Sequence, residues 1–283
     1  MAVITQPDRP RGRGQKLSPG PVKELALSHG LTVLQPVRLK DPEFVARLQD
    51  LSPELMVATA YGRLLTQEML AIPGLGVLNV HASLLPRHRG AAPINWSLIR
   101  GDRETGVTIM WMVYELDAGP IFLQEQVPIG PEDNAGTLAD KLAEAGGALL
   151  VEALKRLRRG ESLKIEQPET GITYAPPLTP EMRLIHWEKS APEVAGWIRG
   201  LDPRPSAYTM WQDQHLRLFG ARVEEPSGRK AAPGTALGII EGRLLVACGQ
   251  GTLSIKELQL AGHKRLPAEV FLRGHHLLGQ VLG

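Results

Sequence analysis

Three polar side chains follow or interrupt apolar runs of the sequence in a pattern typical of catalytic groups. Asn79 and His81 lie within the run Val77–His81, and side chains two residues apart on a strand point to the same face. Asp117 follows a second apolar run, Gly106–Val113. Sites in open α/β sheets lie outside the carboxyl ends of strands, so two strand ends of one sheet would bring these three groups together.

Each of these residues also has a structural explanation, because a histidine near a strand end is more often structural and an asparagine there often closes a turn. Asp117, as a third polar group, favours the catalytic interpretation. We expect no metal site, since Cys248 is the single cysteine and no His-Glu-x-x-His pattern occurs. The adjacent His275 and His276 would diverge on a regular element, so we expect them at the surface.

Alternating helix-like and strand-like stretches place the three residues in an α/β domain that spans residues 1–161. The predicted helices are Pro21–Gly30, Asp41–Gln49, Thr66–Ile72, Pro93–Ile99 and Thr137–Gly160, and the predicted strands are Val33–Val37, Leu55–Ala60, Val77–His81, Gly106–Val113 and Ile121–Val127. Such alternation predicts a doubly wound, mostly parallel sheet.

The pattern changes after residue 161. Residues 162–180 contain several prolines, which is typical of a linker. A helix is expected at Ala191–Leu201, followed by short strands at Tyr208–Gln212, His215–Val223, Thr235–Ile240, Arg243–Cys248 and Leu253–Leu260. We therefore predict that residues 181–283 form a small β-barrel of the OB type.

Composition and charge narrow the class of protein. With 283 residues, 43% hydrophobic and 22% charged, the chain is typical of a soluble globular protein, and it has no apolar run long enough to span a bilayer. Its single cysteine cannot form an intramolecular disulfide, which fits a reducing cytoplasm. Residues 1–23 carry a net charge of +4 although the whole chain carries only +2. The segment Asp8–Ser18 has few apolar side chains, so we expect a mobile basic loop that could hold phosphates. Charge alone would favour a solvated surface.

Two longer stretches resemble the folate-dependent formyltransferases: NVHASLLPRHRGAAPI at residues 79–94 and ETGVTIMWMVYELDAGPI at residues 104–121. The resemblance implies a Rossmann-like formyltransferase fold and transfer of a formyl group from 10-formyltetrahydrofolate to a free amine. The stretch TQPDRPRGRGQKLSPGPVK at residues 5–23 is similar to the branch that acts on initiator methionyl-tRNA. That branch makes formylmethionyl-tRNA for translation initiation.

The resemblance also implies roles for individual residues. Asn79 would donate a hydrogen bond to the oxyanion, His81 would donate a hydrogen bond or a proton, and Asp117 would orient His81 or accept the ammonium proton through water. The folate would lie in an apolar slot near the Asp117 loop and the family's Ser-Leu-Leu-Pro motif, which here is formed by Ser83, Leu84, Leu85 and Pro86.

The basic loop would contact the tRNA acceptor end through Arg11, Arg13 and Lys16. We expect a monomer whose partners are the initiator tRNA and the folate, with no metal and no membrane. Two alternatives remain open: a formyltransferase acting on a small amine such as a sugar nucleotide, and a catalytically silent RNA-binding protein. The basic loop and the C-terminal strands argue against the first, and the intact set of Asn79, His81 and Asp117 argues against the second.

The N-terminus and one proline-rich segment depart from the family pattern. The resemblance implies a strand, a Gly-Thr-Pro-type turn and a helix before Ala2–Ile4, so we expect this chain to lack the usual N-terminal strand and helix. The segment Asp202–Pro205 reads Asp-Pro-Arg-Pro, where the branch commonly has Asn-Pro, an aromatic residue and Pro.

Overall fold

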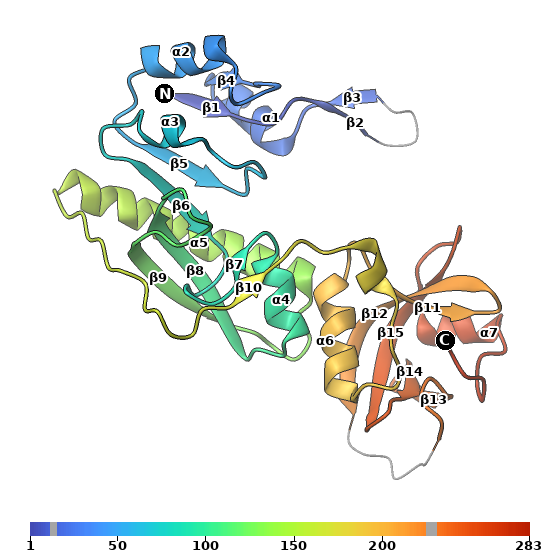
Figure 1. Ribbon diagram of the computed structural model, residues 1–283. Helices are drawn as coiled ribbons and strands as arrows, with labels where there is room; N and C mark the ends of the chain where they lie inside the picture. The colour runs from blue at the N-terminus through green and yellow to red at the C-terminus, as the bar shows by residue number, and fades with distance from the viewer. Residues whose placement is uncertain (12–15, 225–230) are drawn as a thin grey trace. The chain divides into compact units, whose positions relative to one another are not determined.

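The computed structural model describes residues 1–11, 16–224 and 231–283 (Figure 1). Contacts group the chain into two compact units, each built from several stretches. The first unit comprises Met1–His81, Thr108–Leu123 and Ala153–Gln167, and the second comprises Ala82–Val107, Gln124–Glu152 and Pro168–Gly283. No helix in these described ranges is long and apolar enough to cross a lipid bilayer.

The first unit contains most of the predicted N-terminal elements. Its strands are β1 (Ala2–Ile4), β2 (Arg9–Arg11), β3 (Lys16–Ser18), β4 (Thr32–Leu34), β5 (Met56–Thr59) and β6 (Val77–His81), and its helices are α1 (Pro21–Ser28), α2 (Pro42–Asp50) and α3 (Gln67–Leu70). Three further elements run through both units: β8 (Glu104–Trp111), β9 (Ile121–Pro128) and α5 (Ala135–Arg158).

Local sequence explains where the short helices of the first unit begin. The Asp41 carboxylate accepts a hydrogen bond from the Glu43 amide at 3.1 Å, and the Thr66 hydroxyl accepts one from the Met69 amide at 3.2 Å. These caps satisfy amides that a helix leaves without an internal partner. The apolar faces meet in a core of Leu34, Leu39, Phe44, Leu48 and Met69, against which Ile4 and Met56 pack.

The strands of the first unit belong to an α/β fold, as predicted, but their directions are mixed. β1 pairs with β4 in parallel, and a separate four-stranded sheet has the order β5-β6-β8-β9. Within it β5 and β6 are parallel, whereas β6 and β8 are antiparallel. Alternation of helices and strands along a sequence does not by itself specify the direction of each strand.

Strand β5 is less buried than its sequence predicts. The segment Leu55–Ala60 reads as a fully buried strand, yet Val57 is 41% exposed. Among the described residues, β5 pairs with β6 on one side only and lies at the edge of its sheet. An edge strand is covered less completely than a central one, which explains the exposure.

The basic segment near the N-terminus also differs from expectation. Instead of an irregular loop, β2 and β3 form an antiparallel pair in which Arg11 stands opposite Lys16. Backbone hydrogen bonds hold such a pair without apolar side chains, and this is why composition missed it. At its base, the Asp8 carboxylate accepts hydrogen bonds from Gln35 at 2.8 Å and Lys23 at 2.7 Å, and these lower the pKa of Asp8.

The second unit contains the remaining elements. They are β7 (Arg89–Gly90), α4 (Pro93–Ile99), β10 (Tyr174–Ala175), the 3-10 helix η1 (Pro180–Arg183), α6 (Ala191–Leu201), β11 (Ala207–Trp211), β12 (Gln214–Glu224), β13 (Ala236–Ile240), β14 (Arg243–Ala247), β15 (Thr252–Leu260), β16 (Leu266–Pro267) and α7 (Ala268–Arg273).

The predicted β-rich C-terminal half is confirmed, but its described strands do not close into a barrel. They pair in the order β11-β12-β15-β14-β13, with β16 added to β15, so β11 and β13 form the two ends of an open path. The inward faces of these strands, together with α6 and α7, surround a core that includes Ile198, Leu218, Ile255 and Phe271. Strand count and spacing predict the sheet, whereas closure depends on whether its first and last strands meet.

Two glycines let α6 pack closely on α4 (Figure 1). A Cβ added at Gly196 would lie 2.8 Å from the Leu98 carbonyl oxygen, and one at Gly200 would lie 2.9 Å from the Asn95 carbonyl oxygen. The Asn95 side chain in turn donates a hydrogen bond to the Gly200 carbonyl at 2.7 Å. Glycine is therefore required at both positions for this helix contact.

Asp202, directly after α6, is a buried carboxylate. Its residue is 1% exposed, and burial raises the pKa of Asp202 although the Gly220 amide and Arg265 favour the charged form. The Gly220 amide donates to Asp202 Oδ2 at 2.9 Å, and Arg265 Nη1 lies 3.7 Å from Oδ1. The folded state therefore binds a proton here more tightly than the unfolded chain does.

This raised pKa predicts that Asp202 makes folding less favourable as pH rises. As pH rises, the free energy of unfolding begins to fall near the ordinary pKa of Asp in the unfolded chain, and the fall is complete above the raised pKa of the folded state. The fall amounts to about 1.4 kcal/mol for each tenfold difference in proton affinity between the folded and unfolded states. We expect Asp202→Asn to reduce the fall in stability between pH 4 and pH 7, measured by urea denaturation. The exposed Asp140→Asn on α5 serves as the control, and an unchanged pH dependence in Asp202→Asn would contradict the prediction.

Candidate active site

Strand β6 carries two of the three candidate residues. Asn79 stands opposite Met110 of β8, and His81, the last residue of β6, stands opposite Thr108. Because alternate residues of a strand share a face, Asn79 and His81 point to the same side of the sheet. His81 is only 5% exposed, whereas Asn79 is half-buried.

The third candidate, Asp117, reaches His81 by a route that the sequence does not predict. The carboxyl ends of β6 and β8 were expected at one edge, but the strands are antiparallel, so these ends lie at opposite edges. The connection between β8 and β9 must therefore turn back along the sheet to bring Asp117 to His81. Gly119 of this connection lies against the last residue of β8, since a Cβ there would be 1.8 Å from the Trp111 carbonyl oxygen.

His81 and Asp117 form a close pair in the first unit. His81 Nδ1 lies 3.7 Å from Asp117 Oδ2, and the two side chains are 6% and 14% exposed. This distance exceeds a hydrogen bond, but contacts between catalytic groups are often long before substrate binds. A carboxylate beside an imidazole nitrogen can select the tautomer of the ring and stabilise its protonated form.

A residue that sequence analysis did not single out holds the Asp117 turn. Gln167 Nε2 donates to the carbonyl oxygens of both Asp117 and Gly119, each at 2.8 Å. Asp117 has a φ of 47°, a left-handed conformation that is uncommon for residues other than glycine. Gln167 lies in the proline-rich segment that was expected to be a linker. The only feature of the sequence that could have pointed to it is a polar side chain in that segment.

Apolar side chains in the same connection remain uncovered. Tyr114 is 68% exposed and Leu116 is 50% exposed, both within three residues of Asp117. Exposed apolar groups next to a polar pair are typical of a surface that binds an organic ring.

The proposed folate loop, which belongs to the second unit, is internally bonded. The Ser83 hydroxyl donates to the Arg87 carbonyl at 2.6 Å, and Gln124 donates to the Leu85 carbonyl at 2.9 Å. Ser83 and Leu85 are buried, whereas Leu84 and Pro86 are partly exposed. The Ser83 side chain therefore shapes the loop from within.

Asp102 secures the end of this loop. Its carboxylate contacts His88 Nε2 at 2.6 Å and accepts a hydrogen bond from Arg87 at 2.5 Å. Burial by itself would raise the pKa of Asp102, but the hydrogen bonds from His88 and Arg87 outweigh it and hold the pKa below its usual value. The His88 amide also donates to the Thr173 hydroxyl at 2.8 Å.

Two of the three candidate tRNA-binding residues belong to the paired strands β2 and β3. Arg11 ends β2 and Lys16 begins β3. Arg13 lies outside the described residues. Hydrogen bonds among Asp8, Lys23 and Gln35 fix the base of this strand pair within the first unit.

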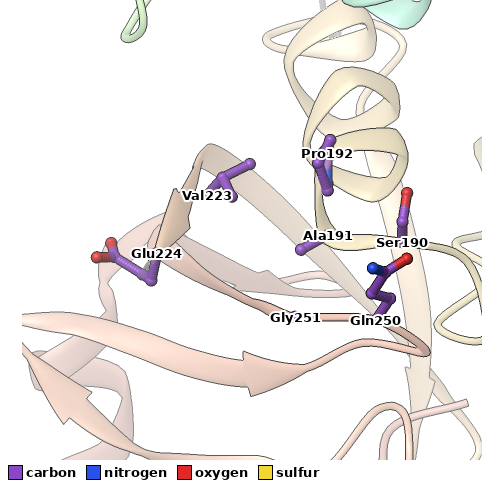
Figure 2. A pocket seen from close by; sticks show the side chains of 7 residues that line it. All are labelled: Ser190, Ala191, Pro192, Val223, Glu224, Gln250 and Gly251. Atoms are coloured by element: carbon purple, nitrogen blue, oxygen red, sulfur yellow. The ribbon is translucent and has the colours of Figure 1, made fainter. Parts of the chain in front are cut away.

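A surface cavity of about 450 Å³ in the second unit contains none of the candidate residues (Figure 2). It is lined by Ser190, Ala191, Pro192, Val223, Glu224, Gln250 and Gly251. Two of its polar side chains already have partners, because Ser190 donates to Glu193 at 2.6 Å and Glu224 accepts from Ser254 at 2.6 Å.

The free cysteine is also inert. Cys248 is buried in the second unit, and burial raises the pKa of its thiol to about 12. A thiol with this pKa is not a nucleophile at neutral pH.

The α/β sheet and the His81–Asp117 pair are compatible with a group-transfer enzyme that uses acid–base chemistry. The class itself is identified by comparison with known families. Residues 1–154 match the formyl transferase family, and residues 177–276 match the formyl transferase C-terminal domain. The chain belongs to the formyl transferase family.

Named relatives are similar over the whole chain. It is 49% identical to the methionyl-tRNA formyltransferase of Moorella thermoacetica, covering 100% of this chain and 91% of the relative. It is 46% identical to the methionyl-tRNA formyltransferase of Citrifermentans bemidjiense, covering 100% and 88%.

Solved structures show the same fold at lower identity. HypX from Aquifex aeolicus in complex with tetrahydrofolic acid has a TM-score of 0.66 at 21% identity, covering 96% of this chain. This chain spans 47% of HypX. An N-formyltransferase from Helicobacter canadensis has a TM-score of 0.66 at 16% identity, covering 93% of this chain and 87% of that one.

The geometry of the pair predicts a catalytic effect for His81. We expect His81→Ala to lower the rate of formyl transfer by roughly 10²- to 10⁴-fold, the usual contribution of general acid–base catalysis. The rate should be measured with saturating formyl donor, and a thermal melt should check that the buried substitution leaves the protein folded. His276→Ala, at an exposed histidine, is the matched control. Full activity in a folded His81→Ala protein would refute the role.

Proposed function

We propose that this protein transfers a formyl group from 10-formyltetrahydrofolate to the amino group of initiator methionyl-tRNA, yielding formylmethionyl-tRNA for translation initiation. The observation that carries the proposal is the similarity over the full chain to methionyl-tRNA formyltransferases, at 49% identity to the Moorella thermoacetica enzyme. The His81–Asp117 pair at 3.7 Å supplies chemistry of the kind this reaction needs.

The reaction forms one carbon–nitrogen bond and breaks another. As the amine attacks the formyl carbon, the formyl oxygen gains negative charge, the attacking nitrogen must lose a proton, and the departing nitrogen must gain one. We assign the Asn79 amide to the developing oxyanion and His81 to hydrogen-bond or proton donation. Asp117 orients His81 or accepts the ammonium proton through water.

The folate is assigned to the loop formed by Ser83, Leu84, Leu85 and Pro86. Leu84 and Pro86 are partly exposed and can contact an apolar ring. Ser83 is buried and contributes by shaping the loop through its hydrogen bond. The exposed Tyr114 and Leu116 offer apolar contact area beside Asp117. Each of these apolar surfaces, taken within its own unit, is of a kind that contacts an organic ring, which is the kind of ligand the proposal requires.

The domain boundaries that we assign are those expected from the sequence. Residues 1–161 form the catalytic domain, residues 162–180 the linker and residues 181–283 the tRNA-binding domain. The family matches to residues 1–154 and 177–276 support this division. The protein acts as a monomer in the cytoplasm, where translation initiation takes place.

A second candidate is formyl transfer to a sugar nucleotide. It is favoured by structural similarity to the Helicobacter canadensis N-formyltransferase, whose complex contains folinic acid and dTDP-3-aminofucose. That likeness, at 16% identity, concerns the fold. The basic β2–β3 hairpin supports a phosphate-rich macromolecule over a small nucleotide.

The direct test is a formylation assay with two acceptors. Purified protein should transfer the formyl group from 10-formyltetrahydrofolate to charged initiator methionyl-tRNA, detected by acid gel or mass spectrometry, and uncharged tRNA should give no product. A dTDP-amino sugar is the second acceptor. Transfer to the sugar with none to methionyl-tRNA would replace the proposal by the second candidate, and transfer to neither would reject both.

The hairpin predicts a salt-dependent contribution to tRNA use. Replacing both Arg11 and Arg13 with Gln should lower kcat/KM for the tRNA and reduce the slope of its logarithm against the logarithm of salt concentration by up to about 2, because each phosphate contact releases counterions. KM for the folate should stay within about 2-fold. Exposed Arg38→Gln with Lys40→Gln is the matched control, and an equal loss for both substrates would count against the assignment.

A further inference from the structure

Hydrogen bonds hold the segment Leu163–Gln167 in place within the first unit at two successive residues, Leu163 and Ile165. The Trp111 indole donates to the Leu163 carbonyl at 3.0 Å. Ile121 and Ile165 exchange two backbone hydrogen bonds, at 2.7 and 2.9 Å. Because both anchors precede Gln167 in this segment, they fix where its side chain begins.

The Gln167 side chain also forms hydrogen bonds with the connection between β8 and β9, which carries Asp117. Its Nε2 atom donates to the Asp117 and Gly119 carbonyls, each at 2.8 Å. Both partners are acceptors, so the amide must present its nitrogen rather than its oxygen to them. A primary amide has two N–H groups and can satisfy both carbonyls at once.

The turn that receives these bonds has a demanding geometry. Asp117 is in a left-handed conformation with φ of 47°. Gly119 approaches β8 so closely that a Cβ would lie 1.8 Å from the Trp111 carbonyl oxygen. The flanking residues Val113 to Leu116 are exposed and contribute little packing. Hydrogen bonds to the turn's own carbonyls therefore weigh heavily in its orientation.

We infer that Gln167 is a positioning residue: its amide holds the Asp117 turn so that the carboxylate stays beside His81. The inference rests on the proposed function for its catalytic consequence. Gln167 lies on a different segment from all three candidate catalytic residues and acts on Asp117 through the backbone of its turn. Since small displacements of catalytic groups reduce rates strongly, loss of this clamp should act on kcat.

Two near-isosteric substitutions separate the hydrogen bonds from side-chain size. Gln167→Met keeps the length of the side chain and removes both donors, and Gln167→Glu places carboxylate oxygens against two carbonyls. We expect kcat for formyl transfer to fall roughly 10- to 100-fold in both variants, with KM for the folate within about 2-fold. Gln167→Asn, which keeps the amide on a shorter stem, should retain more activity than Gln167→Met.

The matched control is Gln259→Met. Gln259 is partly exposed and donates through Nε2 to the His263 carbonyl at 2.8 Å, so it has the same bond type outside the candidate site. Its substitution should leave kcat unchanged. An equal loss in Gln259→Met would show that the effect of Gln167→Met is one of general stability and would overturn the inference.

A double-mutant cycle tests whether Gln167 acts through Asp117. In an Asp117→Ala background, Gln167→Met should cause less than about a 2-fold further loss in kcat, because the group that it positions is gone. A purely structural role for Gln167 would give the same fold loss in both backgrounds, and this result would overturn the inference.

Hydrogen exchange gives a readout that does not depend on activity. In Gln167→Met the amides of residues 114–119 should exchange at least about 5-fold faster than in the unsubstituted protein, and in Gln259→Met they should not change. Unchanged exchange in Gln167→Met would reject the clamp whatever the substrate. Faster exchange in a protein that formylates no methionyl-tRNA would reject the proposed function while retaining the clamp on the turn.

Discussion

The contact between His81 and Asp117 requires a chain reversal, and the arrangement of the candidate site depends on it. Because β8 runs antiparallel to β6, the residues that follow β8 begin at the edge of the sheet opposite His81. Only a connection that turns back along the sheet can place Asp117 Oδ2 at 3.7 Å from His81 Nδ1. The left-handed conformation of Asp117 and the two hydrogen bonds from Gln167 are the local features of this reversal.

Glycine makes several of the close backbone approaches possible. A Cβ at Gly119 would lie 1.8 Å from the Trp111 carbonyl oxygen, and one at Gly106 would lie 2.1 Å from the Glu125 carbonyl oxygen. Gly196 and Gly200 serve α4 and α6 in the same way within the second unit. Two carboxylates of the second unit have pKa values shifted in opposite directions. Hydrogen bonds lower the pKa of Asp102, while burial raises the pKa of Asp202.

Three differences from the sequence-based expectations share one physical origin. The β2–β3 hairpin is held by backbone hydrogen bonds, β5 is half-exposed because it lies at an edge, and the C-terminal strands that the structure describes form an open path. Composition and periodicity describe the side chains of one segment. They carry no information about which backbone edge another segment covers, and that decided each of these cases.

The sequence by itself determined the α/β class, the positions of helices such as Ala191–Leu201, the β-rich C-terminal half and the family, because periodicity and local motifs are properties of short segments. It also singled out Asn79, His81 and Asp117 as candidates from residue type and strand ends. Only the tertiary structure decided the direction of β8, the reversal that brings Asp117 to His81, and the part played by Gln167. Gln167 lies 50 residues from Asp117 in the chain, and a contact over that separation is set by the packing of strands rather than by local sequence.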